Sequence, residues 1–314
     1  MSTRRVALHA TVLTSIGLFW LMRPATASEA LSTRNVTAAA SAGPEARVPG
    51  WLWGEWIRDW ILRGKSKSNT LDVHYLQTPT YFADIRIPKA RSGLAAAKSF
   101  TDLTDQQLRT LAGQNGLTGV TTLAGTVATW SDEVAFQPFD GTPDTSRLER
   151  RSPNVMYEVG LDGSFTESWR RVSDGSGQFL VVRVTHSGRL SHSLVVVGNR
   201  FVYVRNRSKD LPTASSLEEL IETTKATREQ IVEYLDCEFS AGRVRGGSVP
   251  WEIQQSTLPW RERHHLEFVD LLSARAGGTA LVPKSVGVDQ WSIPVNTFKP
   301  SDIQALFTPD AAAK

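Results

Sequence analysis

The chain has 314 residues, of which 40% are hydrophobic and 21% charged, a composition typical of a globular protein with enough apolar material for a core. Its formal charge of +3 comes from Arg4, Arg5 and Arg23, because residues 1–27 contain no acid and the remainder is neutral. Without a Lys/Arg block to form a basic surface, nucleic-acid binding is disfavoured. A single cysteine, Cys237, excludes an intrachain disulfide.

Residues 1–27 have the pattern of a targeting segment. The positively charged residues Arg4 and Arg5 precede an apolar stretch over residues 6–22, and Ala25-Thr26-Ala27 forms a small-x-small cleavage site. The pattern predicts cleavage near Ala27 and a secreted or extracytoplasmic protein. A membrane anchor through residues 6–22 and an organelle transit peptide are the alternatives.

Residues 28–50 are rich in Ala, Ser, Thr and Gly and are expected to be a disordered linker. An aromatic cluster follows, in which Trp53, Trp56 and Trp60 have helical spacing. We expect a short helical turn that leads into a strand near Trp56.

Two strands with period-two alternation are predicted next, over residues 73–78 and 81–87, separated by Pro79. In the second strand Phe82, Asp84 and Arg86 share one face, and the opposite face is apolar. A sheet with one polar, functional side has this pattern.

The middle of the chain contains one predicted helix, which begins with a capping box from Thr104 to Gln107 and ends at Asn115-Gly116. Strands are expected over residues 117–130 and 133–137, and residues 140–144 form a loop.

The most regular region predicts a meander of antiparallel strands joined by hairpin turns. Its five strands are expected at Val155–Val159, Phe165–Arg171, Phe179–Thr185, Leu190–Val197 and Phe201–Arg205. Closure into a barrel would remove the open edge of such a sheet. A second helix (residues 215–235), a last hairpin (residues 237–254) and a helical stretch (residues 266–274) complete the predicted elements.

Several motifs carry a family resemblance. They are Gly54-x-Trp56, Tyr75-Leu76-Gln77-Thr78 with Asp84-Ile85-Arg86-Ile87-Pro88, and Ser256-Thr257-Leu258-Pro259-Trp260. Over residues 51–262 the ordered series resembles a family of uncharacterised bacterial and fungal proteins with a calycin-like (lipocalin-like) β-barrel. The resemblance implies a mainly β fold, an antiparallel up-and-down barrel of about ten strands with two covering helices, followed by a C-terminal extension at residues 263–314. It also implies that Arg261 packs across Trp56 as a structural cation–π pair.

Catalytic and cofactor motifs are absent from the sequence. There is no nucleophile elbow, phosphate-binding glycine loop, dinucleotide fingerprint or zinc helix, and no cofactor or metal is predicted.

The candidate site residues are polar or aromatic side chains within the predicted strands. In a small barrel one strand face points inward, where a carboxylate would have a raised pKa and could act as an acid or base. The candidate catalytic residues are Glu167, Glu158 and Asp84, and the candidate ligand-binding residues are Tyr75, Gln77, Arg86, Gln137 and Trp169. The alternative is that these charges lie on the outer wall, where Asp84 would pair with Arg86 and Glu167 with Arg171, or where they pair across strands.

The leading functional prediction is binding of a small hydrophobic molecule in the barrel. The first alternative is a cofactor-free isomerase or cyclase that uses the lumen carboxylates on a small apolar metabolite. The second is a non-catalytic accessory protein whose barrel is filled by side chains. A fold alone does not separate these three.

Overall fold

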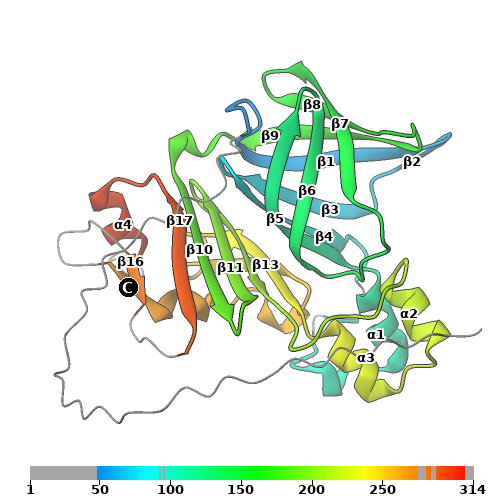
Figure 1. Ribbon diagram of the computed structural model, residues 1–314. Helices are drawn as coiled ribbons and strands as arrows, with labels where there is room; N and C mark the ends of the chain where they lie inside the picture. Colours follow the sequence, from blue (N-terminus) through cyan, green and yellow to red (C-terminus); the bar gives the residue numbers. More distant parts are fainter. Residues whose placement is uncertain (1–47, 92, 95, 275–280, 284–287, 308–314) are drawn as a thin grey trace, which may run out of the picture. The chain divides into compact units, whose positions relative to one another are not determined.

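The computed structural model describes residues 48–91, 93–94, 96–274, 281–283 and 288–307 (Figure 1). The predicted targeting segment, with its candidate anchor at residues 6–22, lies outside these residues. In the part of the chain that is described, no helix is long and apolar enough to cross a membrane.

A closed antiparallel barrel of eight strands forms the first part of the fold (Figure 1). Strand β1 pairs with β3 on one side and with β9 on the other, and this closes the ring. A short strand, β2 (Ser66–Ser68), pairs antiparallel with the end of β1. The barrel strands are β1 (Gly54–Arg63), β3 (Leu71–Gln77), β4 (Tyr81–Pro88), β5 (Asn115–Ala124), β6 (Val127–Ala135), β7 (Asp144–Ser152), β8 (Val155–Gly160) and β9 (Phe165–Ser173). The predicted closure is therefore confirmed.

The alternation in β4 places its two faces in different environments. Phe82 packs inside the barrel with Trp56 and Trp169. Ala83 and Ile85 face outward and join a second core. The predicted separation of polar and apolar faces is confirmed, with the polar face in the lumen.

The barrel is smaller than the predicted ten strands, because the later strands form a separate six-stranded sheet. This second sheet has the order β14-β13-β12-β11-β10-β17 (Figure 1). Its strands are β10 (Phe179–His186), β11 (Arg189–Val197), β12 (Arg200–Arg205), β13 (Glu238–Arg243), β14 (Glu252–Ser256) and β17 (Gln290–Asn296).

The physical reason for the second sheet is that both of its faces are buried. Val181 and Val195 belong to the core shared with the outer wall of the barrel, whereas Val182 and Val196 belong to a core formed with the C-terminal segment. Strands covered on both faces are continuously apolar. The run from Leu194 to Val197 has this character, whereas the strands of the barrel alternate.

The predicted first helix is confirmed as α1 (Asp105–Ala112), with the capping box between Thr104 and Gln107. The predicted single helix over residues 215–235 is two helices, α2 (Leu217–Thr223) and α3 (Arg228–Leu235). Lys225 adopts a φ of 51° between them, and α3 begins with its own capping box from Thr227 to Gln230.

The expected strand near Trp56 is confirmed as β1, and it follows a turn at residues 50–52. The tryptophans therefore do not share a helix face. Two further expectations are corrected. Strand β7 begins at Asp144, which was predicted to lie in a loop. The stretch 266–274 consists of a 3-10 helix at Glu267–Leu271 and strand β15 (Leu272–Ala274), which pairs with β16 (Leu281–Pro283). A short helix, α4 (Pro300–Leu306), follows β17.

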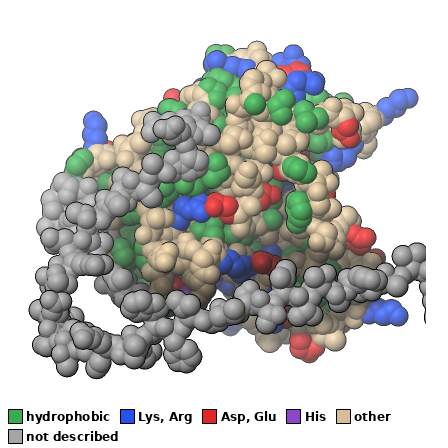
Figure 2. All heavy atoms as spheres, viewed as in Figure 1, with side chains coloured by type: hydrophobic (Ala, Val, Ile, Leu, Met, Phe, Trp, Pro, Cys, Tyr) green, Lys and Arg blue, Asp and Glu red, His purple; other side chains and the backbone are tan. Residues whose placement is uncertain are grey.

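Charged side chains of both signs are scattered over the face shown in Figure 2. No large basic patch is visible among the described residues of this face.

Candidate functional site in the barrel and at its mouth

Five of the predicted site residues meet in the lumen of the barrel. The lumen is lined by Phe82, Leu117, Trp130, Asp144 and Met156 together with the predicted Tyr75, Asp84, Arg86, Glu158 and Trp169. The cavity that they enclose has a volume of about 20 Å³. Such a volume accommodates about one water molecule, so side chains fill most of the interior.

One end of the lumen is held by a buried hydrogen-bond network. Tyr75 donates to Gln77 Oε1, Thr121 Oγ1 donates to the same atom at 2.7 Å, and Trp130 Nε1 donates to the Tyr75 hydroxyl at 3.1 Å. The Gln77 amide nitrogen donates to the Thr78 carbonyl at 2.7 Å. Gln77, predicted as a ligand contact, is therefore fully buried and satisfied by the protein.

Two ion pairs lie inside the barrel. Arg86 donates through Nε to Asp84 Oδ2 at 2.7 Å, and the other Asp84 oxygen accepts from the Leu117 amide at 2.9 Å. Arg58 Nη1 lies 2.5 Å from Glu167 Oε1, and both side chains are buried. The expected outer-wall pair between Glu167 and Arg171 is not formed. Both predicted carboxylates instead point inward, each with an arginine that neutralises its charge.

Glu158 has no such arginine of its own. It lies directly opposite Glu167 across strands β8 and β9, and it is partly buried. Burial and the neighbouring Glu167 carboxylate raise the pKa of Glu158 to about 8, against the opposite effect of Arg86. Burial also raises the pKa of Asp144. Glu158 therefore carries a proton at neutral pH and can donate a hydrogen bond.

The indole nitrogen of Trp169 is buried without a hydrogen-bond partner among the described residues, in a residue that is 2% exposed. Unpaired buried polar groups are uncommon and costly. The Ser146 hydroxyl lies close enough to Glu158 to act against the rise in its pKa. The lumen therefore offers one unused donor, the Trp169 indole, near a protonated carboxyl group.

A larger hollow of about 460 Å³ lies at the Arg86 end of the barrel; we call it the mouth groove. Its walls come from β1, β2, β4, the end of α1, the start of β5 and the start of α2. Arg58, Arg63 and Arg86 line it, with Glu218 as the single acid. The other polar lining residues are Ser66, Ser68, Thr70, Gln114, Asn115, Gln137, Ser215 and Ser216. Arg86 lines both the lumen and the groove.

Gln137, a predicted ligand contact, lies in the wall of the mouth groove but also connects two helices. Its amide nitrogen donates to the Ala112 carbonyl at 2.8 Å, and its oxygen accepts from the Leu217 amide at 2.8 Å. Gln137 thus positions the starts of β5 and α2 around the groove.

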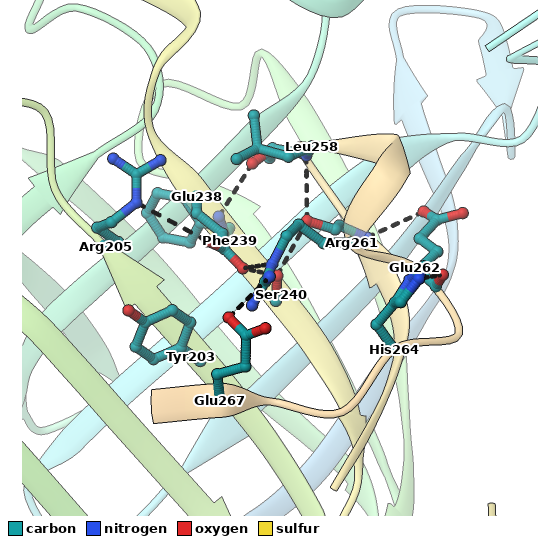
Figure 3. A network of polar contacts seen from close by, with 12 residues as sticks. Tyr203, Arg205, Glu238, Phe239, Ser240, Leu258, Arg261, Glu262, His264 and Glu267 are labelled. Carbon is teal, nitrogen blue, oxygen red and sulfur yellow. Dashed lines mark hydrogen bonds and ion pairs between the residues drawn. The ribbon is translucent and has the colours of Figure 1, made fainter. Parts of the chain in front are cut away.

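The predicted contact between Arg261 and Trp56 is wrong, because another arginine occupies that place. The Arg171 guanidinium lies 5.6 Å from the centre of the Trp56 ring. Arg261 ends a 3-10 helix, Pro259–Arg261, that follows β14, and it lies 3.3 Å from both Glu238 and Glu267 (Figure 3). Since β9 closes the barrel against β1, an arginine near its end is the one that reaches Trp56.

The sequence-based reasoning missed Arg58, Ser146 and Asp144 as residues of the site. Arg58 follows Trp56 in the strand that was predicted there, but the face of that strand was not assigned, and β7 was not predicted. The period-two pattern from Trp56 to Arg58 is the signal that would have placed Arg58 in the lumen.

No group of three or more His, Cys, Asp or Glu side chains suited to a metal ion occurs within the described ranges. Cys237 is buried in the core shared by the two sheets, and burial raises the pKa of its thiol.

No protein-family model matches the chain, and no curated protein matches it. The chain is similar to a solved structure of the uncharacterised protein YLR301w from Saccharomyces cerevisiae, with a TM-score of 0.46 and 11% identity, over 78% of this chain and 98% of that chain. Such a TM-score carries no argument about function.

Proposed function

We propose that the protein binds a small, hydroxyl-bearing organic anion in the mouth groove of its barrel. The observation that carries this proposal is a hollow of about 460 Å³ with three arginines and a series of hydroxyl and amide groups in its walls. Arg58 and Arg86 are paired with Glu167 and Asp84, so Arg63 supplies the positive charge that no carboxylate among the described residues balances. Ligand sites of several hundred Å³ with a few converging polar groups are the usual binding sites of globular proteins. Guanidinium groups favour carboxylate or phosphate, and Ser and Gln side chains favour hydroxyls.

A hydrophobic ligand, which the calycin-like barrel resemblance favours, would need a different interior. The lumen has space for about 20 Å³, and its lining includes Asp84, Arg86, Asp144 and Glu158. An apolar guest would have to displace aromatic side chains and desolvate charged groups, which is costly. A polar guest in the mouth groove requires neither change.

The test compares charged and uncharged ligands of the same size by isothermal titration calorimetry. Gluconate and glycerol phosphate represent the proposed class, and glucose and glycerol are the matched neutral compounds. We expect heat only from the anions. Comparable binding of glucose would contradict the assignment of an anionic group to the arginines.

Arg63→Gln is the variant of choice, because Arg63 is exposed and its removal leaves no buried carboxylate unpaired. Arg151→Gln is the matched control, since Arg151 is exposed on the barrel but does not line the mouth groove. We expect weaker anion binding only in Arg63→Gln. Equal effects of the two variants would show that net charge, and not the groove, attracts the anion.

Acid–base catalysis is a second candidate function, supported by the pKa of about 8 of Glu158. A carboxyl group with a pKa near the working pH is suited to proton transfer. An isomerase or cyclase of this kind would lose turnover in Glu158→Gln and keep ligand affinity. If no ligand binds, the filled lumen supports the third reading, an accessory protein.

A further inference from the structure

A second polar cavity lies between the outer wall of the barrel and the second sheet; we call it the junction pocket. It has a volume of about 160 Å³, and its lining includes Glu55 and His74 from β1 and β3 and Arg200 and Gln255 from β12 and β14. None of these four residues lines the lumen or the mouth groove.

Glu55 organises the charged side of the junction pocket. The residue is 3% exposed, and its Oε1 lies 3.1 Å from His74 Nδ1 and 2.9 Å from Arg200 Nε. Burial alone would raise the pKa of Glu55, but the contacts with His74 and Arg200 outweigh it and lower the pKa. In the tautomer that donates Nδ1–H to Glu55 Oε1, the other ring nitrogen of His74, Nε2, is the one that can accept from a ligand.

Arg200 is held in place by both sheets. Its Nε atom donates to Glu55, and its Nη1 atom donates to Gln254 Oε1 at 2.6 Å. Nη2 has no such contact among the described residues and can donate to a ligand. A guanidinium fixed at two nitrogens is a preorganised donor for a carboxylate.

Gln255 supplies an acceptor that the protein does not use. Its Oε1 atom is buried without a hydrogen-bond partner in the described part of the chain, and its amide nitrogen makes a long contact of 3.5 Å to Asp72. Leaving a buried acceptor unpaired costs free energy. This oxygen is closed off from solvent. If the Gln255 amide turns toward the pocket, the oxygen can accept from a donor group of a ligand, which removes that cost.

These groups define the ligand by charge as well as by size. Glu55 and Arg200 balance each other, so a ligand without net charge preserves neutrality in a partly buried site. Arg200 Nη2 matches a carboxylate, whereas His74 Nε2 and Gln255 Oε1 match a group with several donors, such as an ammonium. A cavity of about 150 Å³ holds a molecule of about six heavy atoms, such as benzene.

We propose that the junction pocket binds a small zwitterionic α-amino acid of the size of alanine. The carboxylate would accept from Arg200, and the ammonium would donate to His74 and Gln255. Leu76 and Phe201, which also line the pocket, would contact the short side chain. This site is independent of the proposed anion site in the mouth groove.

The test is calorimetric titration of the full chain with three compounds. L-alanine has both groups, lactate replaces the ammonium by a hydroxyl, and alaninamide lacks the carboxylate. We expect alanine to bind about tenfold or more tightly than either, the effect of losing a hydrogen bond to a charged group. Absence of heat with alanine at millimolar concentrations, or equal binding of lactate, would overturn the proposal.

Gln255→Leu separates a binding role from a structural one. Replacing an unpaired buried acceptor should leave stability unchanged or increased, while alanine affinity falls about tenfold. Gln290→Leu makes the same change at an exposed position of the second sheet and should leave affinity unchanged. Arg200→Lys should also weaken binding, because it loses the planar fork. Unaltered affinity in both Gln255→Leu and Arg200→Lys would refute the assignment.

Discussion

Glu158→Gln provides the sharpest test of the polar lumen, because it removes one titration with little change in shape. In the folded protein the pKa of Glu158 is raised from 4.5 to about 8, chiefly by burial and then by Glu167. Between these values the folded state holds a proton that the unfolded chain has released. The free energy of unfolding should therefore fall as the pH rises through this range.

The size of the effect follows from the rise in the pKa of Glu158 from 4.5 to about 8. Each pKa unit is worth about 1.4 kcal/mol, so the whole rise would lower the free energy of unfolding by about 5 kcal/mol. Glu158 is partly open to solvent and lies beside the Glu167 carboxylate. We therefore expect about 2 kcal/mol after allowing for screening and coupling. The variant, which stays neutral, should match the wild type at pH 5 and exceed it by this amount at pH 8.5.

The assay is urea denaturation followed by tryptophan fluorescence at a series of pH values from 5 to 9. Glu222→Gln, an exposed position on α2, is the matched control and should follow the wild-type pH dependence. A difference between Glu158→Gln and the wild type that stays constant across pH would refute the reasoning, because it would mean that Glu158 is ionised throughout.

Three further predictions concern substitutions in the barrel, and each is tested by measuring the change in the free energy of unfolding. Arg58→Leu should cost about 3–5 kcal/mol, since it leaves Glu167 buried and unpaired, and replacing both residues by Leu should restore most of this loss. Arg171→Met should cost about 0.5–2 kcal/mol through loss of the cation–π contact with Trp56. Gly119→Ala should cost about 1–3 kcal/mol, because its Cβ would lie 2.0 Å from a carbonyl oxygen of β6.

Arg171→Met and Gly119→Ala each have a matched control. Arg261→Met should leave the barrel unaffected, since Arg261 pairs with residues of the second sheet and the segment after it. Gly113→Ala should be nearly neutral, because the nearest atoms to its Cβ are 3.4 Å and 3.6 Å away and its φ is −78°. Equal costs for a change and its control would contradict the corresponding contact.

The sequence predicted the inward-facing strand β4 because its pattern is local. Phe82, Asp84 and Arg86 alternate with Ala83 and Ile85. Pairing with the neighbouring strands determines only which of the two faces lies in the lumen. The same alternation is weaker in the second sheet, where burial on both faces makes the strands uniformly apolar. For a meander of such strands, the sequence does not indicate whether the strands continue a barrel or form a new sheet.

Partners of charged side chains depended on closure and could not be predicted from neighbours in sequence. Asp84 and Arg86 lie two residues apart and pair as expected for residues of one face. Glu167 and Arg171 lie four residues apart on one strand face and were the alternative outer-wall pair, but the β1–β9 contact brings Arg58 to Glu167. Local spacing thus identifies a pair only where no partner from another strand competes.

The charges in the lumen also bear on whether the barrel interior is a site or only a core. Buried ion pairs are seldom the most stabilising way to fill a core, since apolar replacements of similar volume are often neutral or favourable. Arg58 and Glu167 could be exchanged for leucines on stability grounds alone. Because Arg58 also lines the mouth groove, that exchange should preserve folding and weaken anion binding. A double variant that folds and binds anions like the wild type would show that the pair only fills the barrel.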